Sequence, residues 1–343
     1  MATVTVGLDL AKSVFQVHGV DSGGRTILRR RLSRGRLLDF FRQLPPCRIG
    51  MEACASAHHW ARQLVHLGHD VRLIPPQYVK PYVKRNKTDA ADAEAICEAV
   101  SRPNMRFVPI KTVDQQAVLA LHRARALLVR QRTQLANAIR GLLGEFGIVV
   151  PKGIRRLAEL RVRAADTAPD GLPDEARSAV TLLFRQLEVT RDRIGAVEAG
   201  ILAWHARSEV SQRLATAPGI GPITATALVA AVGDARQFAS ARRFAAWLGL
   251  TPRVTASGGK EKLGKISKAG DRYLRTLLIH GARGLVAVLH RPSVMPRPWL
   301  LALVGRRPVN VAATALAHKT ARAVWAMLTR QEAWRAPVRT AAA

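Results

Sequence analysis

The sequence is poor in cysteine, in aromatic residues and in acidic residues. It has three cysteines in 343 residues, Cys47, Cys54 and Cys97, and none are spaced as Cys-x-x-Cys. This argues against both a disulfide framework and a structural zinc site, and it fits a reducing cytoplasm. Aromatic residues make up 5% of the chain, so base stacking is not expected to dominate contacts with nucleic acid.

Long apolar runs are also missing. No segment reaches the roughly 20 apolar residues of a membrane span, and the N-terminus lacks the charged-then-apolar order of a signal peptide. We therefore expect no membrane association. Hydrophobic residues still make up 48% of the chain, and its length exceeds one ordinary domain, which predicts two or three units with cores of their own.

The shortage of acids leaves a formal net charge of +30. Residues 1–105 hold 16 basic and nine acidic side chains, whereas residues 251–343 hold 17 basic and three acidic ones. Arginine outnumbers lysine, and its planar guanidinium suits bidentate contact with phosphate. A GC-rich genome would explain the arginine share but not the missing acids. The charge therefore favours nucleic acid as a partner.

Residues 1–108 have the pattern of a mixed α/β sheet that starts with a hairpin. Predicted strands cover residues 3–10, 15–20, 26–32, 47–51 and 71–74. A short helix is predicted after Ser33, which is a plausible N-cap, and two further helices are predicted over residues 57–67 and 89–100. The order β-β-β-α-β-α-β-α matches a ribonuclease-H-like layout.

Helical periodicity dominates residues 109–213. One line of apolar residues lies within 113–147 and another within 174–213: Leu121, Leu128, Leu135 and Leu142, with Val118 and Ile139; then Val180, Leu187, Ile194 and Ile201, beside Leu183, Val197 and Trp204. A basic segment broken by Pro and Gly, 151–173, separates them. This predicts an antiparallel coiled-coil arm, with two core helices of a bundle as the alternative. Arg125 and Arg132 at would-be seam positions favour the arm, because full burial would oppose them.

Residues 214–343 form the third predicted domain, which is mostly helical. Pro-Gly-Ile-Gly-Pro at 218–222 indicates a helix–hairpin–helix, in which Gly219 and Gly221 allow a tight turn whose amides face a phosphate. Residues 251–267 are dense in Gly and Lys and are predicted to be a loop. Helices over about 269–289 and 309–331 complete the domain.

Four acids stand out against the positive charge. Asp9 and Glu52 each follow a predicted strand, and Asp89 and Asp92 lie three residues apart on one helix face. Taken singly, Asp9 could form a turn, Glu52 could be solvated and Asp89 could cap a helix with Thr88. Together they predict a carboxylate site for Mg²⁺ or Mn²⁺, in which two ions bind a scissile phosphate.

Other polar residues near these motifs can be explained without a role at the metal site. Lys12 could touch a bound phosphate or be a solvated turn residue. His58 and His59 could be ligands, but we expect them on the helix after Glu52. Asp114 and Glu94 are interpreted as surface charges.

The motifs resemble those of the DEDD transposases of the insertion-sequence 110 family. The matching segments are Gly-Leu-Asp-Leu-Ala-Lys at 7–12, Gly-Met-Glu-Ala-Cys at 50–54 and Arg-Asn-Lys-Thr-Asp-Ala-Ala-Asp-Ala at 85–93, followed by Pro-Gly-Ile-Gly-Pro, Phe-Ala-Ala-Trp-Leu-Gly-Leu-Thr-Pro-Arg at 244–253, Ser-Gly-Gly-Lys at 257–260 and Lys-Ile-Ser-Lys-Ala-Gly-Asp at 265–271. The segment around Met-Glu-Ala-Cys looks most like the 1111 subgroup. One departure is that Ala55 and Ser56 stand where glycine-type residues are expected, and another is His59 in place of an aromatic residue.

The resemblance implies an RNA-guided recombinase with a RuvC-like N-terminal domain and a C-terminal transposase domain. It implies donor and target DNA and an element-encoded bridge RNA as partners. It also implies a homodimer or homotetramer with composite sites, in the prokaryotic cytoplasm near the nucleoid. A serine nucleophile that forms a phosphoserine link to DNA is implied as well, and Ser257 matches it.

The residues around Ser257 favour this role independently. Gly258 and Gly259 give close approach, and basic side chains surround the serine: Arg253, Lys260, Lys262 and Lys265. Together with Lys268, these basic residues are also expected to contact nucleic acid. The alternative is a phosphate-binding loop in which Ser257 only hydrogen-bonds DNA. Ser240 and Ser267 compete for the role, but each looks like a helix-start residue.

Three functions therefore compete. The preferred one is an RNA-guided serine recombinase assisted by metal-binding carboxylates. The second is a metal-dependent Holliday-junction nuclease in which water attacks and no covalent intermediate forms. The third is a non-catalytic nucleic-acid-binding protein, which the charge alone would allow.

Overall fold

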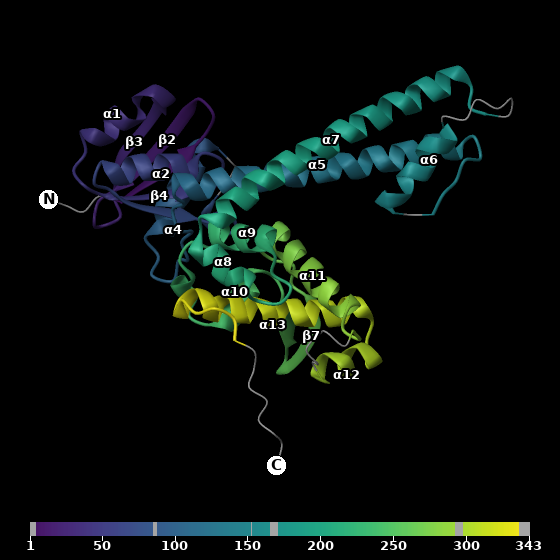
Figure 1. The fold of residues 1–343 in the computed structure, drawn as a ribbon. Helices are drawn as coiled ribbons and strands as arrows, with labels where there is room; N and C mark the ends of the chain where they lie inside the picture. The colour runs from purple at the N-terminus through teal and green to yellow at the C-terminus, as the bar shows by residue number, and fades with distance from the viewer. Residues whose placement is uncertain (1–4, 85–87, 152, 165–170, 292–297, 336–343) are drawn as a thin grey trace, which may run out of the picture. The chain divides into compact units, whose positions relative to one another are not determined.

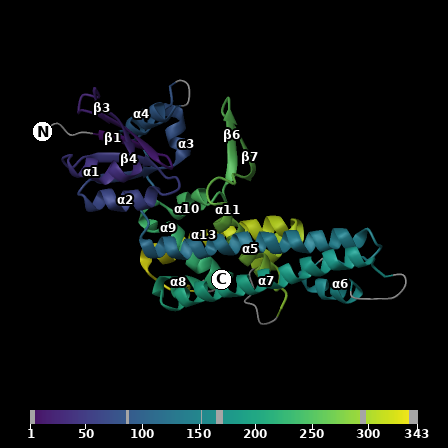
Figure 2. The same cartoon turned by 90° about the horizontal axis from the view of Figure 1, so that it is seen from above.

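The computed structural model describes residues 5–84, 88–151, 153–164, 171–291 and 298–335. The chain divides into two compact units, residues 1–112 and 113–343, which are drawn in Figure 1 and, from above, in Figure 2. The division at residues 108 and 213 inferred from the sequence stays a prediction.

The first unit contains a mixed five-stranded sheet in the order β3-β2-β1-β4-β5. Its strands are β1 Thr5–Leu10, β2 Val14–Val20, β3 Thr26–Ser33, β4 Arg48–Glu52 and β5 Asp70–Ile74. β1 is antiparallel to β2 and parallel to β4, which is parallel to β5. The predicted mixed sheet is confirmed, although residues 3 and 4 of the first predicted strand lie outside the described residues.

Helices cover both faces of this sheet. The short helices after β3 and β5 are η1 Arg34–Arg36, α1 Leu37–Arg42, α3 Pro76–Val79 and η2 Lys80–Tyr82, and the longer ones are α2 Ala57–His66 and α4 Asp89–Val100. Val6 and Leu8 of β1 share a core with Phe41 of α1 and Leu64 of α2. Since side chains alternate along a strand, Gly7 and Asp9 face the other side, where α4 packs.

Two glycines let α4 approach the sheet closely. A Cβ added to Gly7 would lie 2.1 Å from the carbonyl oxygen of Ala93, and one added to Gly50 would lie 2.7 Å from Cβ of Val100. Neither position has room for a side chain. The backbone of α4 therefore lies almost directly on β1, and the helix start is brought beside the carboxyl end of that strand.

The second unit is mainly helical. Its elements are α5 Val113–Gly144, η3 Ile154–Arg156, α6 Leu157–Ala164, α7 Asp174–Ala206, α8 Glu209–Ala215, α9 Pro222–Val232, η4 Ala235–Gln237, α10 Ala241–Trp247, β6 Pro252–Ser257, β7 Lys260–Ile266, α11 Arg272–Ala287, α12 Pro298–Arg306 and α13 Val309–Arg330. The bundle from α8 to α13 has its own large apolar core. The single helix predicted over 174–213 is wrong in detail, because Ser208 caps a new helix, α8.

The two long helices α5 and α7 run antiparallel and side by side, with α6 near their far end (Figure 1). Trp204 donates to Asp114 at 2.8 Å near one end, and Arg125 donates to Glu198 at 2.7 Å further along. Asp114 is thus an interhelical acceptor rather than only a surface charge. Whether the pair supercoils stays a prediction.

The buried seam of α5 is not the predicted leucine line. Leu142 is 42% exposed, and the buried residues of α5 are Val118, His122, Ala136, Ile139 and Leu143. With Arg125 and Arg132 included, the steps between these residues are three, four or seven, which fits a heptad seam containing polar residues. On α7, Val180, Leu187, Ile194 and Ile201 are buried as predicted.

His122 joins α5 to the bundle. Its Nε2 lies 3.0 Å from Oγ1 of Thr226, whose hydroxyl donates to the Pro222 carbonyl, so Nε2 is the donor. Its Nδ1 then accepts from the hydroxyl of Tyr273 at 3.1 Å. Burial lowers the pKa of His122 to about 4, so the ring is neutral at physiological pH.

The predicted loop 251–267 is wrong: it contains a β-hairpin, β6 and β7, that projects from the helices of its unit (Figure 2). Gly258 and Gly259 have φ of +55° and +75°, which is the geometry of a two-residue type I′ turn. Ser267 is not an N-cap either, because α11 starts at Arg272 and is capped by Asp271. Ser240 does cap α10.

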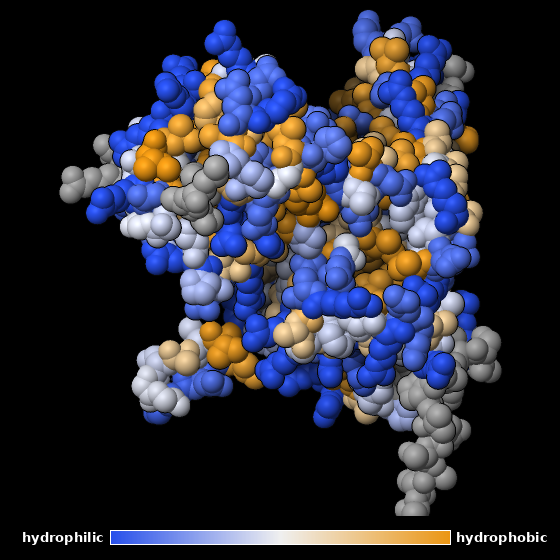
Figure 3. Space-filling view, turned by 90° about the vertical axis from the view of Figure 1, so that its left-hand side faces the viewer, coloured by the Kyte–Doolittle hydropathy of each residue, from blue (hydrophilic) through white to orange (hydrophobic). Residues whose placement is uncertain are grey.

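Hydrophilic residues cover much of the face drawn in Figure 3, with apolar patches between them. Within the described ranges, none of the helices is long and apolar enough to cross a membrane.

We predict that Gly7→Ala lowers the free energy of unfolding by about 2–3 kcal/mol, because the added methyl group must displace α4. Gly35→Ala is the matched control, since a Cβ there meets nothing within 4 Å, and it should leave stability unchanged or slightly higher. Urea unfolding of both variants measures the difference. Equal stabilities would show that α4 does not depend on this close approach.

Candidate active site

Strand ends and a helix start bring the four predicted carboxylates together. Leu8 of β1 pairs with Met51 of β4, so the next residues, Asp9 and Glu52, lie side by side at the carboxyl ends of two parallel strands. Asp9 is on the face covered by α4, two residues beyond Gly7. Asp89 and Asp92 occupy the first turn of α4, after the N-cap Thr88, which accepts from the Ala91 amide.

Three of these acids form a tight group. Carboxylate oxygens of Asp9, Asp89 and Asp92 all lie within 4.8 Å of one another. Glu52 is outside this group, but its charge still acts on Asp9. Asp89 is exposed and the other three are partly buried, so the group is open to solvent on one side.

Burial and mutual repulsion make Asp9 hard to ionise. Burial first, and then the charges of Asp92, Asp89 and Glu52, raise the pKa of Asp9 from 3.8 to about 6. A cation between the carboxylates would remove this repulsion. The donor set consists of hard oxygen ligands, which suit Mg²⁺ or Mn²⁺ rather than zinc, so the residues present fit a divalent metal of that kind.

The other polar candidates near this group do not join it. His58 and His59 lie on α2, as expected, and His58 Nδ1 accepts from the Lys111 amide at 3.2 Å. Lys12 is exposed after β1, and its carbonyl accepts from Arg34. Ser56, which stands where the family resemblance leads us to expect glycine, has φ of +70° just before α2.

Ser257 is the last residue of β6, in the second unit. It pairs with Lys260 across the turn, and Thr255 pairs with Lys262, so these four residues share one face of the hairpin. The other face carries Val254 and Leu263, which are 56% and 68% exposed. The serine is thus exposed on the cationic face of an amphipathic ribbon.

The remaining predicted nucleic-acid contacts fall into two groups. Arg253, Lys265 and Lys268 are exposed on or just after the hairpin. Gly219 and Gly221 lie in the turn between α8 and α9. Gly219 has φ of +84°, and a Cβ there would meet Leu285 and Gly281 of α11 at 3.0 and 3.2 Å, so it also serves packing. Gly221 is exposed and precedes α9.

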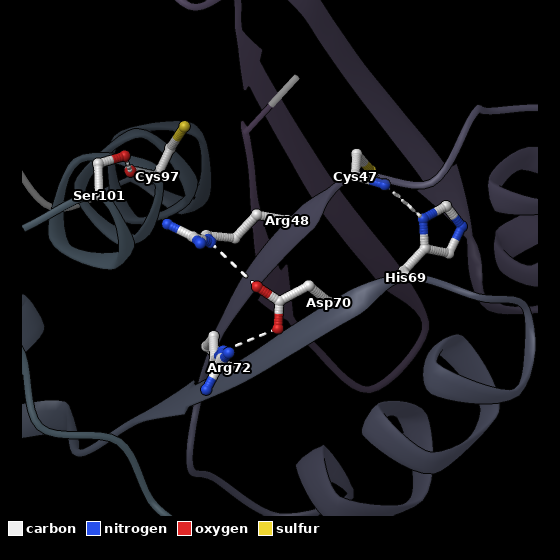
Figure 4. Close-up of polar contacts among 7 residues, drawn as sticks. All are labelled: Cys47, Arg48, His69, Asp70, Arg72, Cys97 and Ser101. Carbon is white, nitrogen blue, oxygen red and sulfur yellow. Dashed lines mark hydrogen bonds and ion pairs between the residues drawn. The ribbon is translucent and has the colours of Figure 1, made fainter. Parts of the chain in front are cut away.

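A Cys–His pair at the opposite end of the sheet is structural (Figure 4). Nδ1 of His69 lies 3.4 Å from Sγ of Cys47, and Nε2 lies 3.1 Å from the Phe41 carbonyl. Burial raises the pKa of the Cys47 thiol to about 11, so it is not a thiolate nucleophile at neutral pH. Beside it, Asp70 accepts from Arg48 and Arg72.

The sequence reasoning missed Gln16 and Arg31, which the strand register aligns with Asp9. The alternation of residues along the hairpin 14–33 shows which of them share a face of the sheet. It does not show which residue of one strand lies opposite Asp9, because that depends on the strand register, which the structure supplies.

Family comparisons agree with this arrangement. Residues 6–148 match the DEDD model for transposases of IS110 elements, described as "Transposase", and residues 211–297 match one described as "Transposase IS116/IS110/IS902 family". The chain therefore carries the N-terminal domain of a transposase of the DEDD class.

Full-length relatives specify the family. The chain is 53% identical to a "Probable family 20 transposase" of Pseudomonas aeruginosa, over 96% of this chain and 98% of that protein. It is 43% identical to the transposase of IS1111A from Coxiella burnetii, over 96% and 91% of the two chains, and 43% identical to that of IS1328 from Yersinia enterocolitica, over 96% and 98%. The chain belongs to the IS110/IS116/IS902 family of insertion-sequence transposases.

We predict that Asp9→Asn stabilises the metal-free protein by about 1–2 kcal/mol at pH 7.5 after allowance for solvent screening. The folded-state pKa is raised, so the contribution of Asp9 to stability is fully present below the unfolded value of 3.8 and is lost as the pH rises through about 6. The advantage of the variant should therefore shrink from pH 6 to pH 4.

Thermal unfolding across this pH range, with and without Mn²⁺, measures the effect. Mn²⁺ should raise the melting temperature of the wild type but not of Asp9→Asn. The exposed Asp39→Asn in α1 is the control. If Asp9→Asn has the same melting temperature as the wild type at neutral pH, the neighbouring carboxylates do not destabilise ionised Asp9.

Proposed function

We propose that this transposase is an RNA-guided, site-specific DNA recombinase that cuts and rejoins DNA through a phosphoserine intermediate at Ser257. The observation that carries the metal-dependent part is the convergence of Asp9, Asp89 and Asp92, with Glu52 beside them, at the end of the central strands. Family membership supports DNA as the substrate. RNA guidance rests on the family resemblance.

In this proposal the carboxylates hold divalent cations and thereby orient the scissile phosphate. Divalent cations held there, in the two-ion arrangement of phosphodiester enzymes, would neutralise the scissile phosphate and the developing charge on the leaving oxygen. Asp9 and Glu52 provide ligands from rigid strand ends, whereas Asp89 and Asp92 provide them from the first turn of α4. Because α4 is held against Gly7, these ligands are fixed before the substrate binds.

Ser257 provides the nucleophile in this scheme. Its Oγ bonds to phosphorus as the ester bond to the leaving deoxyribose oxygen breaks, and the proton that the serine hydroxyl releases is balanced by the one that the leaving oxygen takes up. Lys260 and Lys262, on the same face of the hairpin, stabilise the negative charge that develops on the phosphate. One phosphodiester is exchanged for another, so a second DNA hydroxyl can reverse the step and rejoin the strand.

The carboxylates and Ser257 lie in different compact units. A composite site assembled from two subunits of a homodimer or homotetramer would bring them to one phosphate, as the family resemblance implies. The bridge RNA would then pair with donor and target DNA and select the phosphate.

A metal-dependent junction nuclease is the second candidate, because the carboxylate group alone would suffice for attack by water. The two functions differ in whether DNA becomes covalently attached to the protein.

We predict that the full-length protein, its guide RNA and a nicked suicide substrate give a covalent protein–DNA adduct that Ser257→Ala abolishes. Denaturing gels with labelled DNA measure the adduct. Ser267→Ala removes a nearby serine of the same unit and should retain it. Metal-dependent cleavage without any adduct would favour the nuclease, and neither activity would leave a binding protein.

We predict that Asp92→Ala lowers strand exchange by roughly two or more orders of magnitude, because a ligand to the scissile phosphate's cation is lost. DNA affinity should change less than about threefold and stay sensitive to salt, because phosphates are bound mainly by Arg and Lys. Strand-exchange assays and filter binding separate the two quantities. An equal loss of binding would assign these acids a structural role.

A further inference from the structure

A pocket of about 450 Å³ lies beside the carboxylate group, between the start of α4 and strands β2 and β3. Its strand wall includes Gln16, His18, Arg29 and Arg31, and its helix wall includes Thr88 and Glu94. β3 is the edge strand of the sheet, so the pocket opens at the sheet border.

The strand register places this wall in line with Asp9. β1 and β2 pair Asp9 with Gln16, and β2 and β3 pair Gln16 with Arg31, so the three residues form one row across the sheet. The next row is Gly7, His18 and Arg29. Gly7 faces α4, and side chains alternate along each strand, so both rows face α4.

The charge of this pocket is positive, because three arginines and a single acid, Glu94, line it. Arg29 and Arg31 line it from the face turned toward α4, and Arg30 borders it although its side chain starts from the opposite face. None of the ion pairs found among the described residues involves these arginines. Its acid, Glu94, is bound by Lys84 at 3.0 Å. A neighbouring pocket of about 550 Å³ differs, because acids and bases balance there: Asp21, Glu94 and Glu98 against Arg48, Lys84 and Arg102.

The spacing suits a nucleic-acid backbone. Neighbouring strands lie about 4.8 Å apart, so Arg31 is about 10 Å from Asp9 along the row. Successive phosphates of one strand lie further apart through space than their rise of about 3.4 Å along the duplex axis, so this span reaches the one or two phosphates next to one bound at the carboxylates. Gln16 lies between the two and can donate to a phosphate oxygen.

We propose that Arg29 and Arg31, with Gln16, form a trough that holds the DNA backbone next to the phosphate positioned at the carboxylates. The trough continues the row of residues that starts at Asp9, so a phosphate bound in it is next to the phosphate at the carboxylates. Both phosphates then belong to the strand that is cut, and the ligand of the trough is DNA. The trough rests on the proposed function of the carboxylates. It adds positioning residues that hold phosphates other than the reacting one.

Arg30 supplies the matched control. It lies between Arg29 and Arg31 on β3, but it pairs with Val17, which is buried in the core on the opposite face of the sheet. Its side chain therefore starts from the other face, and Arg30→Gln removes the same charge from the same strand. All three arginines are exposed on an edge strand, so the variants should fold.

The test measures the affinity of the full-length protein for a short fluorescent single-stranded DNA and for RNA of the same sequence, in Ca²⁺ and over a range of salt. The double variant Arg29→Gln/Arg31→Gln should weaken DNA binding about tenfold, and the salt slope should fall by about 1 to 1.5. Arg30→Gln should change the affinity less than twofold. For the double variant, the affinity for DNA should fall by at least as large a factor as the affinity for RNA.

Mn²⁺ binding, followed by electron paramagnetic resonance, separates the two proposals. If wild type and double variant bind Mn²⁺ alike and DNA affinity does not change, the trough is overturned and the carboxylate site stands. If the wild type binds no Mn²⁺, the carboxylate proposal fails, and the salt slope without metal still decides the trough. An equal effect of Arg30→Gln, or a larger loss for RNA, also overturns it.

Discussion

The contact of α4 with β1 at Gly7 is the constraint on which the rest of the first unit depends. Without a side chain at Gly7, the helix backbone comes close enough for Asp89 and Asp92 to reach the carboxylate of Asp9. The same helix start also forms one wall of the arginine-lined pocket. A single small residue thus positions both the acidic group and one wall of the pocket beside it.

The acidic group is costly for the fold in the absence of a cation. Burial and three neighbouring carboxylates oppose the ionisation of Asp9, and no arginine or lysine is paired with Asp9, Asp89 or Asp92 among the ion pairs of the described residues. Elsewhere in this basic chain such partners are common, as at Asp70. Carboxylates whose mutual repulsion raises a pKa in this way are more common at functional sites than at structural ones.

Local sequence signals predicted what depends on neighbours along the chain. Strand ends located Asp9 and Glu52, and a cap with three-residue spacing located Asp89 and Asp92. The seam of α5 could not be predicted in the same way, because burial of His122 depends on Thr226 and Tyr273, far along the chain. The hairpin has a local turn signal, Gly258-Gly259. The segments on either side of it are rich in polar and basic residues and lack the regular apolar alternation of a strand, so the sequence predicts a loop there.

The hairpin that carries Ser257 has almost no buried surface. All residues of β6 are exposed, and β7 has one partly buried residue, Ile266. A two-stranded ribbon of this kind is marginally stable by itself in water. If Ser257 is the nucleophile, the fold of the hairpin does little to hold it in place, because the apolar side chains of the ribbon, Val254 and Leu263, are themselves mostly exposed. The serine would then be placed by whatever binds the ribbon, and not by the ribbon itself.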